Sequence, residues 1–233
     1  MREKIKIIYV DEELVVCHKM PGIPVQTQRA GQKDMVSLLR NYFSAKGEDT
    51  NIFVVHRLDQ PVEGLIVFAR SQKAAAELSR QSREHHMDKC YMALTEGIFE
   101  TPCGVMEHYL LRDGKANFSR VVSKDTPKAK LAKLSYEVKQ TWKEKDPAVS
   151  LVCVKLESGR HHQIRVQMMH AGHPLVGDKK YNPNCQTGYL PVGLCSIKIG
   201  FCHPKDGRKM EFMVEPQGEA FQDMSVDRKD EQY

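Results

Sequence analysis

The chain has 233 residues, of which 41% are hydrophobic and 28% are charged. This length and composition fit one globular domain and contain too much apolar side chain for a disordered protein. Apolar runs such as 65–69 have five residues, far below the ~18 that indicate a membrane span. The N-terminal residues mix charges with apolar side chains and do not predict a signal peptide. We therefore expect a cytoplasmic protein without a membrane segment.

Charge is unevenly distributed along the chain. Lys and Arg number 35 against 30 Asp and Glu, a net charge of +5. Residues 215–233 carry six acids and two bases, so this end has a charge of −4 and the rest of the chain +9. Residues 124–145 contain seven lysines and three acids. Such a patch attracts polyanions such as nucleic acid, although solvated lysine runs also occur on proteins that bind nothing acidic.

The seven cysteines predict neither a disulfide framework nor a zinc ribbon. Their number is odd, and no two of them form a Cys-x-x-Cys pair. Both features argue against paired or metal-bound thiols. We expect reduced cysteines that are mostly buried.

Hydrophobic periodicity and turn residues predict many short strands and few helices. Strands are expected at 5–10, 14–19, 52–55, 64–70, 91–94, 118–122, 131–141, 149–157, 195–201 and 209–214. Helices are expected around 37–43, at 72–86 after Ser71 as N-cap, and at 160–171 before Gly172 and Pro174.

The order of these elements predicts an α+β fold with a mixed, mostly antiparallel sheet. Strands outnumber helices, and most connections are too short for a parallel crossover. No repeat with a period of 20 to 50 residues interrupts the pattern. We assign residues 1–216 to one domain and 217–233 to a polar, acidic C-terminal tail that we expect to be mobile.

Two segments are candidates for chemistry. Residues 56–70 join a charged turn, with Arg57 and Asp59, to an apolar strand. Sites often lie on loops held by rigid strands, but an ordinary turn in which Asp59 bonds its own backbone also fits this segment. Residues 158–182 are dense in Arg, His and Gln within an expected helix and loop.

Four histidines in the second segment raise the question of a metal site. They stand at positions 161, 162, 170 and 173, and no pair has the i, i+4 spacing that places two ligands on one helical face. Packing or phosphate contacts are the favoured roles, and we predict no metal. A metal-dependent hydrolase that uses these histidines and Asp178 remains an alternative.

Together these segments resemble the RluA-like family of RNA pseudouridine synthases. One signature of that family is matched by His56, Arg57, Leu58, Asp59, Gly64 and Leu65. A second is matched by Gly159, Arg160, His162, Gln163, Ile164, Arg165, Gly172, His173, Pro174, Gly177 and Asp178, and a weaker third by Lys89, Tyr91 and Ala93. The likeness extends over residues 7 to 215 in family order.

The resemblance implies a pseudouridine synthase catalytic fold with flanking helices and a central cleft. It implies an isomerase that breaks the bond from N1 of a uridine to its sugar, rotates the uracil and rejoins it through C5, without a cofactor. Asp59 would be the catalytic carboxylate, and Arg165 would pair with it and favour its charged form. Tyr91 would stack on the uracil and assist proton transfer at C5, although an ordinary strand aromatic is the alternative.

The resemblance also implies residues that bind the substrate. The nucleotide would be extruded from the RNA, and Arg57 would occupy the vacated space. Leu58 and Ile164 would form walls of the uracil pocket, unless they are plain core residues. The substrate-binding set is completed by Arg160, His162 and Gln163, and phosphate contacts by Lys179, Lys180 and the basic stretch 124–145. These contacts predict an RNA affinity that falls steeply with salt.

Two departures from the family pattern stand out. Val62 and Glu63 replace the Thr-Ser of many members, and Glu63 either alters RNA contacts at the cleft or faces solvent. The pattern begins within the first ten residues, so we expect no separate N-terminal S4-type module. Ribosomal or transfer RNA is the expected partner, and a monomer the default. A catalytically silent RNA-binding protein on the same fold is the main alternative, and a glycosidase-like pair of Asp59 and Glu63 is a weaker one.

Overall fold

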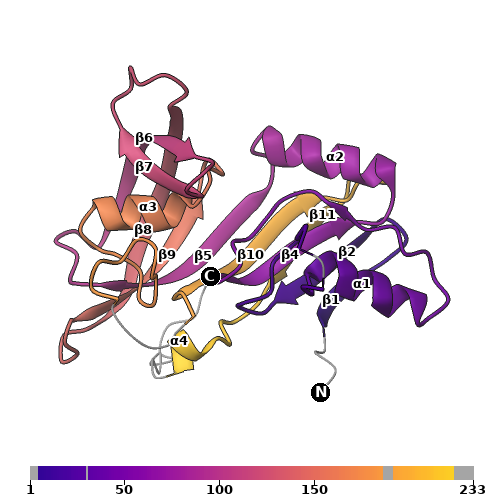
Figure 1. Ribbon diagram of the computed structural model, residues 1–233, viewed down its shortest axis with the longest axis horizontal. Coiled ribbons are helices and arrows are strands. Elements are labelled where there is room, and N and C mark those ends of the chain that lie inside the picture. The colour runs from indigo at the N-terminus through magenta and orange to yellow at the C-terminus, as the bar shows by residue number, and fades with distance from the viewer. Residues whose placement is uncertain (1–4, 30, 186–190, 223–233) are drawn as a thin grey trace.

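The structure, a computed structural model, describes residues 5–29, 31–185 and 191–222 and forms one long, mixed sheet flanked by helices (Figure 1). The strands are β1 Lys6–Val10, β2 Leu14–Lys19, β3 Phe53–Val54, β4 Glu63–Ala69, β5 Asp88–Glu96, β6 Cys103–Asp113, β7 Phe118–Val122, β8 Lys130–Trp142, β9 Val149–Leu156, β10 Leu194–Cys202 and β11 Lys209–Met213. The helices are α1 Met35–Ser44, α2 Gln72–Arg83, α3 Gln163–His170 and α4 Glu219–Gln222.

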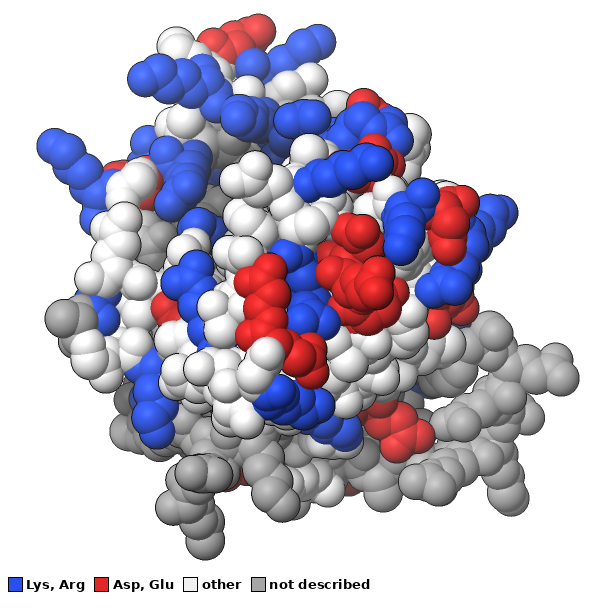
Figure 2. Space-filling model, turned by 90° about the vertical axis from the view of Figure 1, so that its right-hand side faces the viewer, with Lys and Arg blue, Asp and Glu red and all other residues white. Residues whose placement is uncertain are grey.

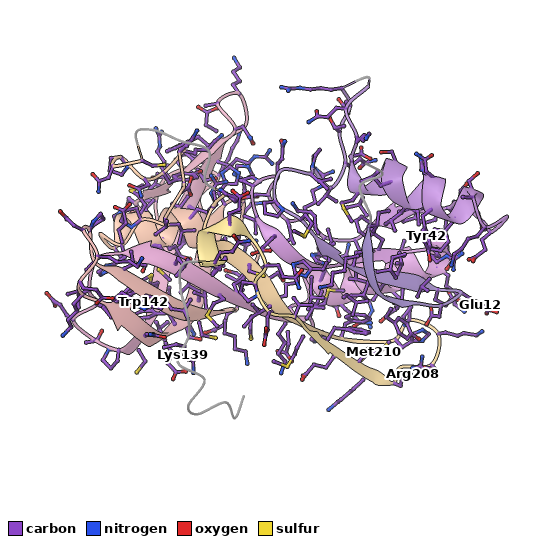
Figure 3. All side chains as sticks on the ribbon, turned by 90° about the horizontal axis from the view of Figure 1, so that it is seen from below. Glu12, Tyr42, Lys139, Trp142, Arg208 and Met210 are labelled. Carbon is purple, nitrogen blue, oxygen red and sulfur yellow. The ribbon has the colours of Figure 1, made fainter. Side chains whose placement is uncertain are left out.

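The sheet runs in the order β1-β2-β4-β10-β5-β9-β8-β6-β7, with β11 paired to β10 and β3 paired to β4. All strand pairs are antiparallel except β4 with β10. The expected α+β class with a mostly antiparallel sheet is therefore confirmed. Lys139 and Trp142 of β8 mark one end of the molecule, and Tyr42 and Met210 lie toward the other (Figure 3).

The sheet is buried on both faces at β2 and β4, near the β1 edge. Val15 and Phe68 belong to one apolar cluster, which includes Leu39 and Phe43 of α1. Val16 and Val67 belong to a second cluster, which includes Leu78 of α2. Because both faces are covered, these strands are continuous apolar runs instead of alternating patterns.

β4 and β10 run side by side for only two residue pairs, Glu63 with Cys195 and Gly64 with Ser196. Beyond these two pairs, β4 pairs with β3 and β10 pairs with β11. Gly64 has a φ of +114°, and a Cβ at this position would overlap the backbone of Ser196. The sheet therefore divides at a position where only glycine fits.

Several elements differ from the sequence-based predictions, among them α4, which was not predicted, and β5, which is longer than the expected 91–94. β6 was not predicted, because its apolar residues Val105, Met106, Tyr109 and Leu110 are spaced by three and four instead of alternating. α2 ends at Arg83 instead of residue 86, since His85 adopts a left-handed conformation with a φ of 59°. The helix expected at 160–171 begins only at Gln163, because residues 160–162 form a turn.

The N-cap at Ser71 and most other elements agree with expectation. Ser71 accepts a hydrogen bond from the backbone N–H of Ala74, as its N-cap role predicts. Asp34 caps α1 in a reciprocal capping box with Ser37. Strand pairing of β1 with β2 across residues 11–13 also follows the prediction.

The start of the expected C-terminal tail packs on the sheet. After β11, residues 219–222 form the short helix α4, and Ala220 is buried beside Met92 and Cys195. The remainder of the tail, from residue 223 onward, lies outside the described residues.

All seven cysteines are free thiols, as the sequence predicts. Cys17 and Cys195 are buried, whereas Cys103 is exposed and the other four are partly exposed. The prediction that these thiols are mostly buried is therefore wrong. The partly exposed and exposed thiols belong to strands, except Cys185, which lies in a loop.

Acidic and basic side chains are interspersed on the face at the α1 and α2 end (Figure 2). Ion pairs join Arg70 to Glu48, and Arg80 to both Glu77 and Glu84. This mixture differs from a single-sign field, which would be expected of a surface dedicated to polyanions.

No helix within the described ranges has the length and hydropathy needed to cross a membrane.

Because β4 and β10 meet closely at Gly64, we expect Gly64→Ala to destabilise the protein. The new methyl group would overlap Ser196 and hold an unfavourable φ, which together cost more than about 2 kcal/mol in the free energy of unfolding. Urea denaturation followed by circular dichroism measures this change. Gly114→Ala is the matched control, because a Cβ there meets no atom within 4 Å. Similar stabilities for the two variants would contradict the account of the divided sheet.

Candidate active site

Asp59 lies in the loop between β3 and β4, and buried groups tie this loop to residues 20–24. Lys19, at the end of β2, is fully buried, and its Nζ donates to the carbonyls of Met20, Ile23 and Gln60 at 2.9 to 3.0 Å. The backbone N–H of Gly22 and the side-chain amide of Gln60 add two further bonds across the same gap. Burial lowers the pKa of Lys19 to about 7, although Asp59 and Glu63 oppose this shift.

Arg165 holds the carboxylate of Asp59 from α3. Its Nη1 donates to Oδ2 of Asp59 at 3.0 Å. Its Nε and Nη2 donate to the two carboxylate oxygens of Asp178, each at 2.7 Å. Burial opposes the charge of Arg165, but the hydrogen bonds and charges of Asp178 and Asp59 raise its pKa. The pairing of Asp59 with Arg165 that the resemblance implies is thus present in the geometry.

Asp178 is the partner that sequence reasoning did not place in the site. Its side chain is fully buried, and it also accepts the backbone N–H groups of Lys180 and Tyr181. The bidentate bond to Arg165 fixes the plane of the guanidinium. The signal available in the sequence was the position of Asp178 in the second motif, which does not reveal its contact with Arg165.

Tyr91 approaches the site from β5. It is 7% exposed, and burial together with the charge of Asp59 raises the pKa of its hydroxyl. The phenol therefore stays protonated at neutral pH. It lines the same cavity as Asp59 and Arg165.

His162 stands immediately before α3, close to Asp59. Its Nε2 lies 3.5 Å from Oδ2 of Asp59, and its Nδ1 lies 2.8 Å from the hydroxyl of Tyr181. Burial lowers the pKa of His162 to about 4, and the nearby charge of Asp59 opposes this shift. The imidazole is therefore neutral at physiological pH.

These groups line a cavity of about 910 Å³, together with residues of α2 and of the turn before α3. Within the described chain, a single carboxylate, Asp59, lines this cavity. The cations that line it come from several separate elements: Arg57, Arg83, Lys89, Arg112, Arg160, Arg165 and Lys180. Such an excess of positive charge in a concave site attracts a polyanion.

The cavity contains seven of the nine residues that the sequence singled out: Arg57, Leu58, Asp59, Tyr91, Arg160, His162 and Arg165. Gln163 and Ile164 do not line it. Gln163 accepts from the Ser158 hydroxyl and the Arg160 backbone, and so it holds the turn before α3. Ile164 is buried in the same apolar cluster as Leu58.

The basic stretch 124–145 does not line the cavity. It covers the connection after β7, all of β8 and the start of the next turn, and Lys133 pairs with Glu157 and Lys139 with Glu137. Three of the cations that line the cavity instead belong to α2, β5 and β6, namely Arg83, Lys89 and Arg112. Arg83 and Arg112 lie outside the motifs and were missed, while Lys89 was noted in the third signature but not assigned to the site.

The four histidines of the second segment lie against different neighbours. His161 stacks on His162, whereas His170 meets His108 and His173 stacks on Phe99. His161 and His162 thus lie together, whereas His170 and His173 pack against other rings, which favours the packing roles over one metal shared by all four.

Glu63 is buried, and so neither expectation for this residue holds. Its two oxygens accept the backbone N–H groups of Gln217 and Gly218, and His18 lies 3.4 Å away. A Cβ on Gly218 would lie 2.8 Å from Oε1 of Glu63. The side chain that departs from the family pattern therefore anchors the C-terminal segment against the start of β4.

Comparisons with known proteins agree with this fold and site. A family model described as RNA pseudouridylate synthase matches residues 13–170. The uncharacterized RNA pseudouridine synthase YhcT of Bacillus subtilis is 33% identical over 76% of this chain and 58% of its own length. Ribosomal large subunit pseudouridine synthase C of Vibrio vulnificus is 30% identical over 93% of this chain and 67% of its own length.

Solved structures share the fold. Human RNA Pseudouridylate Synthase Domain Containing 1 has a TM-score of 0.77 and 22% identity, over 92% of this chain and 84% of that chain. Human RNA Pseudouridylate Synthase Domain Containing 4 has a TM-score of 0.74 and 20% identity, over 90% of this chain and 88% of that chain. The chain belongs to the RNA pseudouridylate synthase family, which confirms the resemblance found in its motifs. It spans about three fifths to two thirds of the length of the curated relatives it matches.

The buried ion pair predicts that Asp178→Asn lowers the free energy of unfolding by about 3 kcal/mol, because an uncompensated guanidinium remains in a buried site. The new amide would also direct a donor toward Arg165 or toward the backbone N–H groups. Urea denaturation measures the loss. Glu157→Gln, which removes one partner of the exposed pair with Lys133, is the control and should leave the midpoint unchanged. Equal effects of the two substitutions would argue against a special role for Asp178.

Proposed function

We propose that this protein is an RNA pseudouridine synthase that isomerises uridine to pseudouridine. The observation that carries the proposal is Asp59, the single carboxylate among the described residues that line a cation-rich cavity, held there by Arg165. Membership of the pseudouridylate synthase family supports the same activity. A polyanionic substrate fits the charge of the cavity, and a fixed carboxylate fits glycosidic chemistry.

In the proposed reaction the bond from N1 of the uracil to C1′ breaks, and C5 bonds to C1′ after the ring has rotated. The proton on C5 is lost and N1 gains one, so the reaction is redox-neutral and needs no cofactor. Asp59 is the carboxylate at the centre of these steps, as nucleophile or as base. Arg165 keeps it charged and oriented.

Tyr91 is assigned to the uracil. Its phenol is protonated at neutral pH because burial and Asp59 raise its pKa. We assign its ring to stacking on the base and its hydroxyl to hydrogen bonding. A protonated phenol is able to donate a proton but does not act as the base that removes one from C5.

The remaining site residues are assigned to the RNA. Arg57 is exposed on the catalytic loop and occupies the space of the extruded uridine. Leu58 forms the apolar wall, while Arg160 and His162 contact the substrate from the turn before α3. Gln163 and Ile164, which lie behind the cavity surface, support these groups without direct contact.

We propose ribosomal or transfer RNA as the substrate, and a monomer that acts in the cytoplasm. The name of the Vibrio vulnificus relative refers to the large ribosomal subunit, which favours ribosomal RNA. Target choice depends on loop contacts and RNA shape, so it does not follow from the fold.

The alternative is a catalytically silent protein that binds RNA on the same fold. Cations alone suffice for binding, whereas a carboxylate in the cavity repels phosphate. Burying the charges of Asp178 and Arg165 costs free energy, and RNA binding alone does not require a pair that holds Asp59 in place. The active enzyme is therefore the better-supported reading.

Tritium release from RNA labelled at C5 of uridine tests the activity. The wild-type protein should release tritium from total RNA of a strain that lacks this gene, and Asp59→Asn should reduce the rate by more than about 10³-fold, because the amide is not nucleophilic. Glu144→Gln, on an exposed turn, is the control and should match the wild type. Salt-sensitive RNA binding without tritium release from either protein would favour the silent binding module.

Arg57→Ala tests base extrusion. Loss of the side chain that fills the vacated space should slow turnover at least tenfold on a uridine in a structured stem-loop, since extrusion costs a few kcal/mol there. A short single strand has little stacking to disrupt, so its turnover should change less than threefold. Lys115→Ala, on an exposed turn outside the cavity, should affect neither substrate. Equal losses on both substrates would assign Arg57 to general binding instead.

A further inference from the structure

His162 has an unusual backbone conformation directly beside the catalytic loop. Its φ of 54° and ψ of 28° lie in the left-handed region, and its side chain does not cap α3. The conformation is unfavourable for a residue with a Cβ and persists only where surrounding contacts enforce it. Here the ring is 8% exposed and stacks on His161 with centroids 3.7 Å apart.

The two ring nitrogens of His162 face different partners. Nδ1 is 2.8 Å from the hydroxyl of Tyr181, and Nε2 is 3.5 Å from Oδ2 of Asp59, slightly longer than an N–H···O hydrogen bond. Contacts of this kind often tighten when the substrate is bound. A neutral imidazole carries one proton, so the question is which nitrogen holds it.

Tyr181 decides between the two tautomers. Its oxygen accepts the backbone N–H of Ser119 at 2.8 Å, and its single proton is then available for Nδ1 of His162. This leaves the imidazole proton on Nε2, directed at the carboxylate of Asp59. In the opposite tautomer a nitrogen lone pair would face the carboxylate, which is electrostatically unfavourable.

We propose that Tyr181 and His162 form a positioning pair for Asp59, in which Tyr181 donates to Nδ1 and His162 donates from Nε2 to Oδ2. Arg165 donates to the same oxygen at 3.0 Å. Among the described contacts of the carboxylate, both groups therefore hold Oδ2, and Oδ1 is presented to the substrate. The catalytic role of this pair rests on the proposed function. The proposed hydrogen bonds among Tyr181, His162 and Asp59 do not depend on that function.

The surroundings keep His162 in the neutral form that this arrangement requires. Burial lowers its pKa, Arg165 of α3, His161 and Lys180 lower it further, and Asp59 opposes them. His161 is itself engaged by Ser119 and Asn117. A neutral donor orients the carboxylate without transferring a proton to it, and so leaves Asp59 charged for the reaction.

Nitrogen-15 NMR of labelled histidine tests the hydrogen bonds without any assay of activity. In the wild-type protein, long-range correlation spectra should show His162 with a protonated Nε2 and a bare Nδ1 across pH 5.5 to 8. Tyr181→Phe should abolish this preference, since Nδ1 loses its donor. A protonated Nδ1 in the wild type would overturn the proposal, even if the protein proves to be a synthase.

Kinetics test the positioning role. Tyr181→Phe should reduce kcat about tenfold, as expected for loss of one hydrogen bond, and leave KM within twofold. Tyr109→Phe removes a hydroxyl from β6 and is the matched control, which should retain the wild-type kcat. An unchanged kcat for Tyr181→Phe, or an equal loss in the control, would contradict the proposal.

A double-mutant cycle separates this role from a merely structural one. If Tyr181 acts through His162, then Tyr181→Phe should have no further effect on kcat once His162→Ala is present. If Tyr181 only stabilises the fold through Ser119 and Phe118, its effect should persist in that background. Absence of tritium release by the wild type, with the NMR signature intact, would instead reject the proposed function alone.

Discussion

The site depends on the bidentate bond between Arg165 and Asp178. A guanidinium buried at the start of α3 requires a carboxylate, and Asp178 supplies both oxygens from the loop after that helix. With two of its donors fixed in this way, the third nitrogen of Arg165 is directed at Asp59. The orientation of the Asp59 carboxylate is thus set by a residue that does not touch it, in a medium where charge pairing is strong.

A second constraint acts on the backbone that carries Asp59. Lys19 donates hydrogen bonds to three backbone carbonyl groups around its turn. The absence of a Cβ at Gly64 allows β4 to approach the backbone of β10 before the sheet divides. The loop with Asp59 precedes this division, where it faces α3 instead of a neighbouring strand. The buried Lys19 and the start of β4 therefore provide rigid ends for the loop that lines the cavity. In this chain Glu63 adds an anchor for the C-terminal segment at the same place.

Much of the fold was predictable because its elements carry local signals. The strands at 5–10 and 14–19 and the cap at Ser71 follow from short-range patterns, which the structure confirms. β6 has no alternation, since part of it faces α3 and part faces solvent, and its pairing with β7 and β8 decides its conformation. The turn at 160–162 was also missed, because the side chain of Gln163 holds it there.

The sequence by itself determined the family and the residues at the centre of the site, because Asp59, Tyr91 and Arg165 lie in motifs whose spacing along the chain is informative. Only the tertiary structure decided the partners: Asp178 behind Arg165, Tyr181 behind His162, and the C-terminal backbone on Glu63. The physical reason is that these contacts depend on distances across the fold. Hydrogen bonds and ion pairs act over about 3 Å, and spacing along a chain does not specify which side chains come that close.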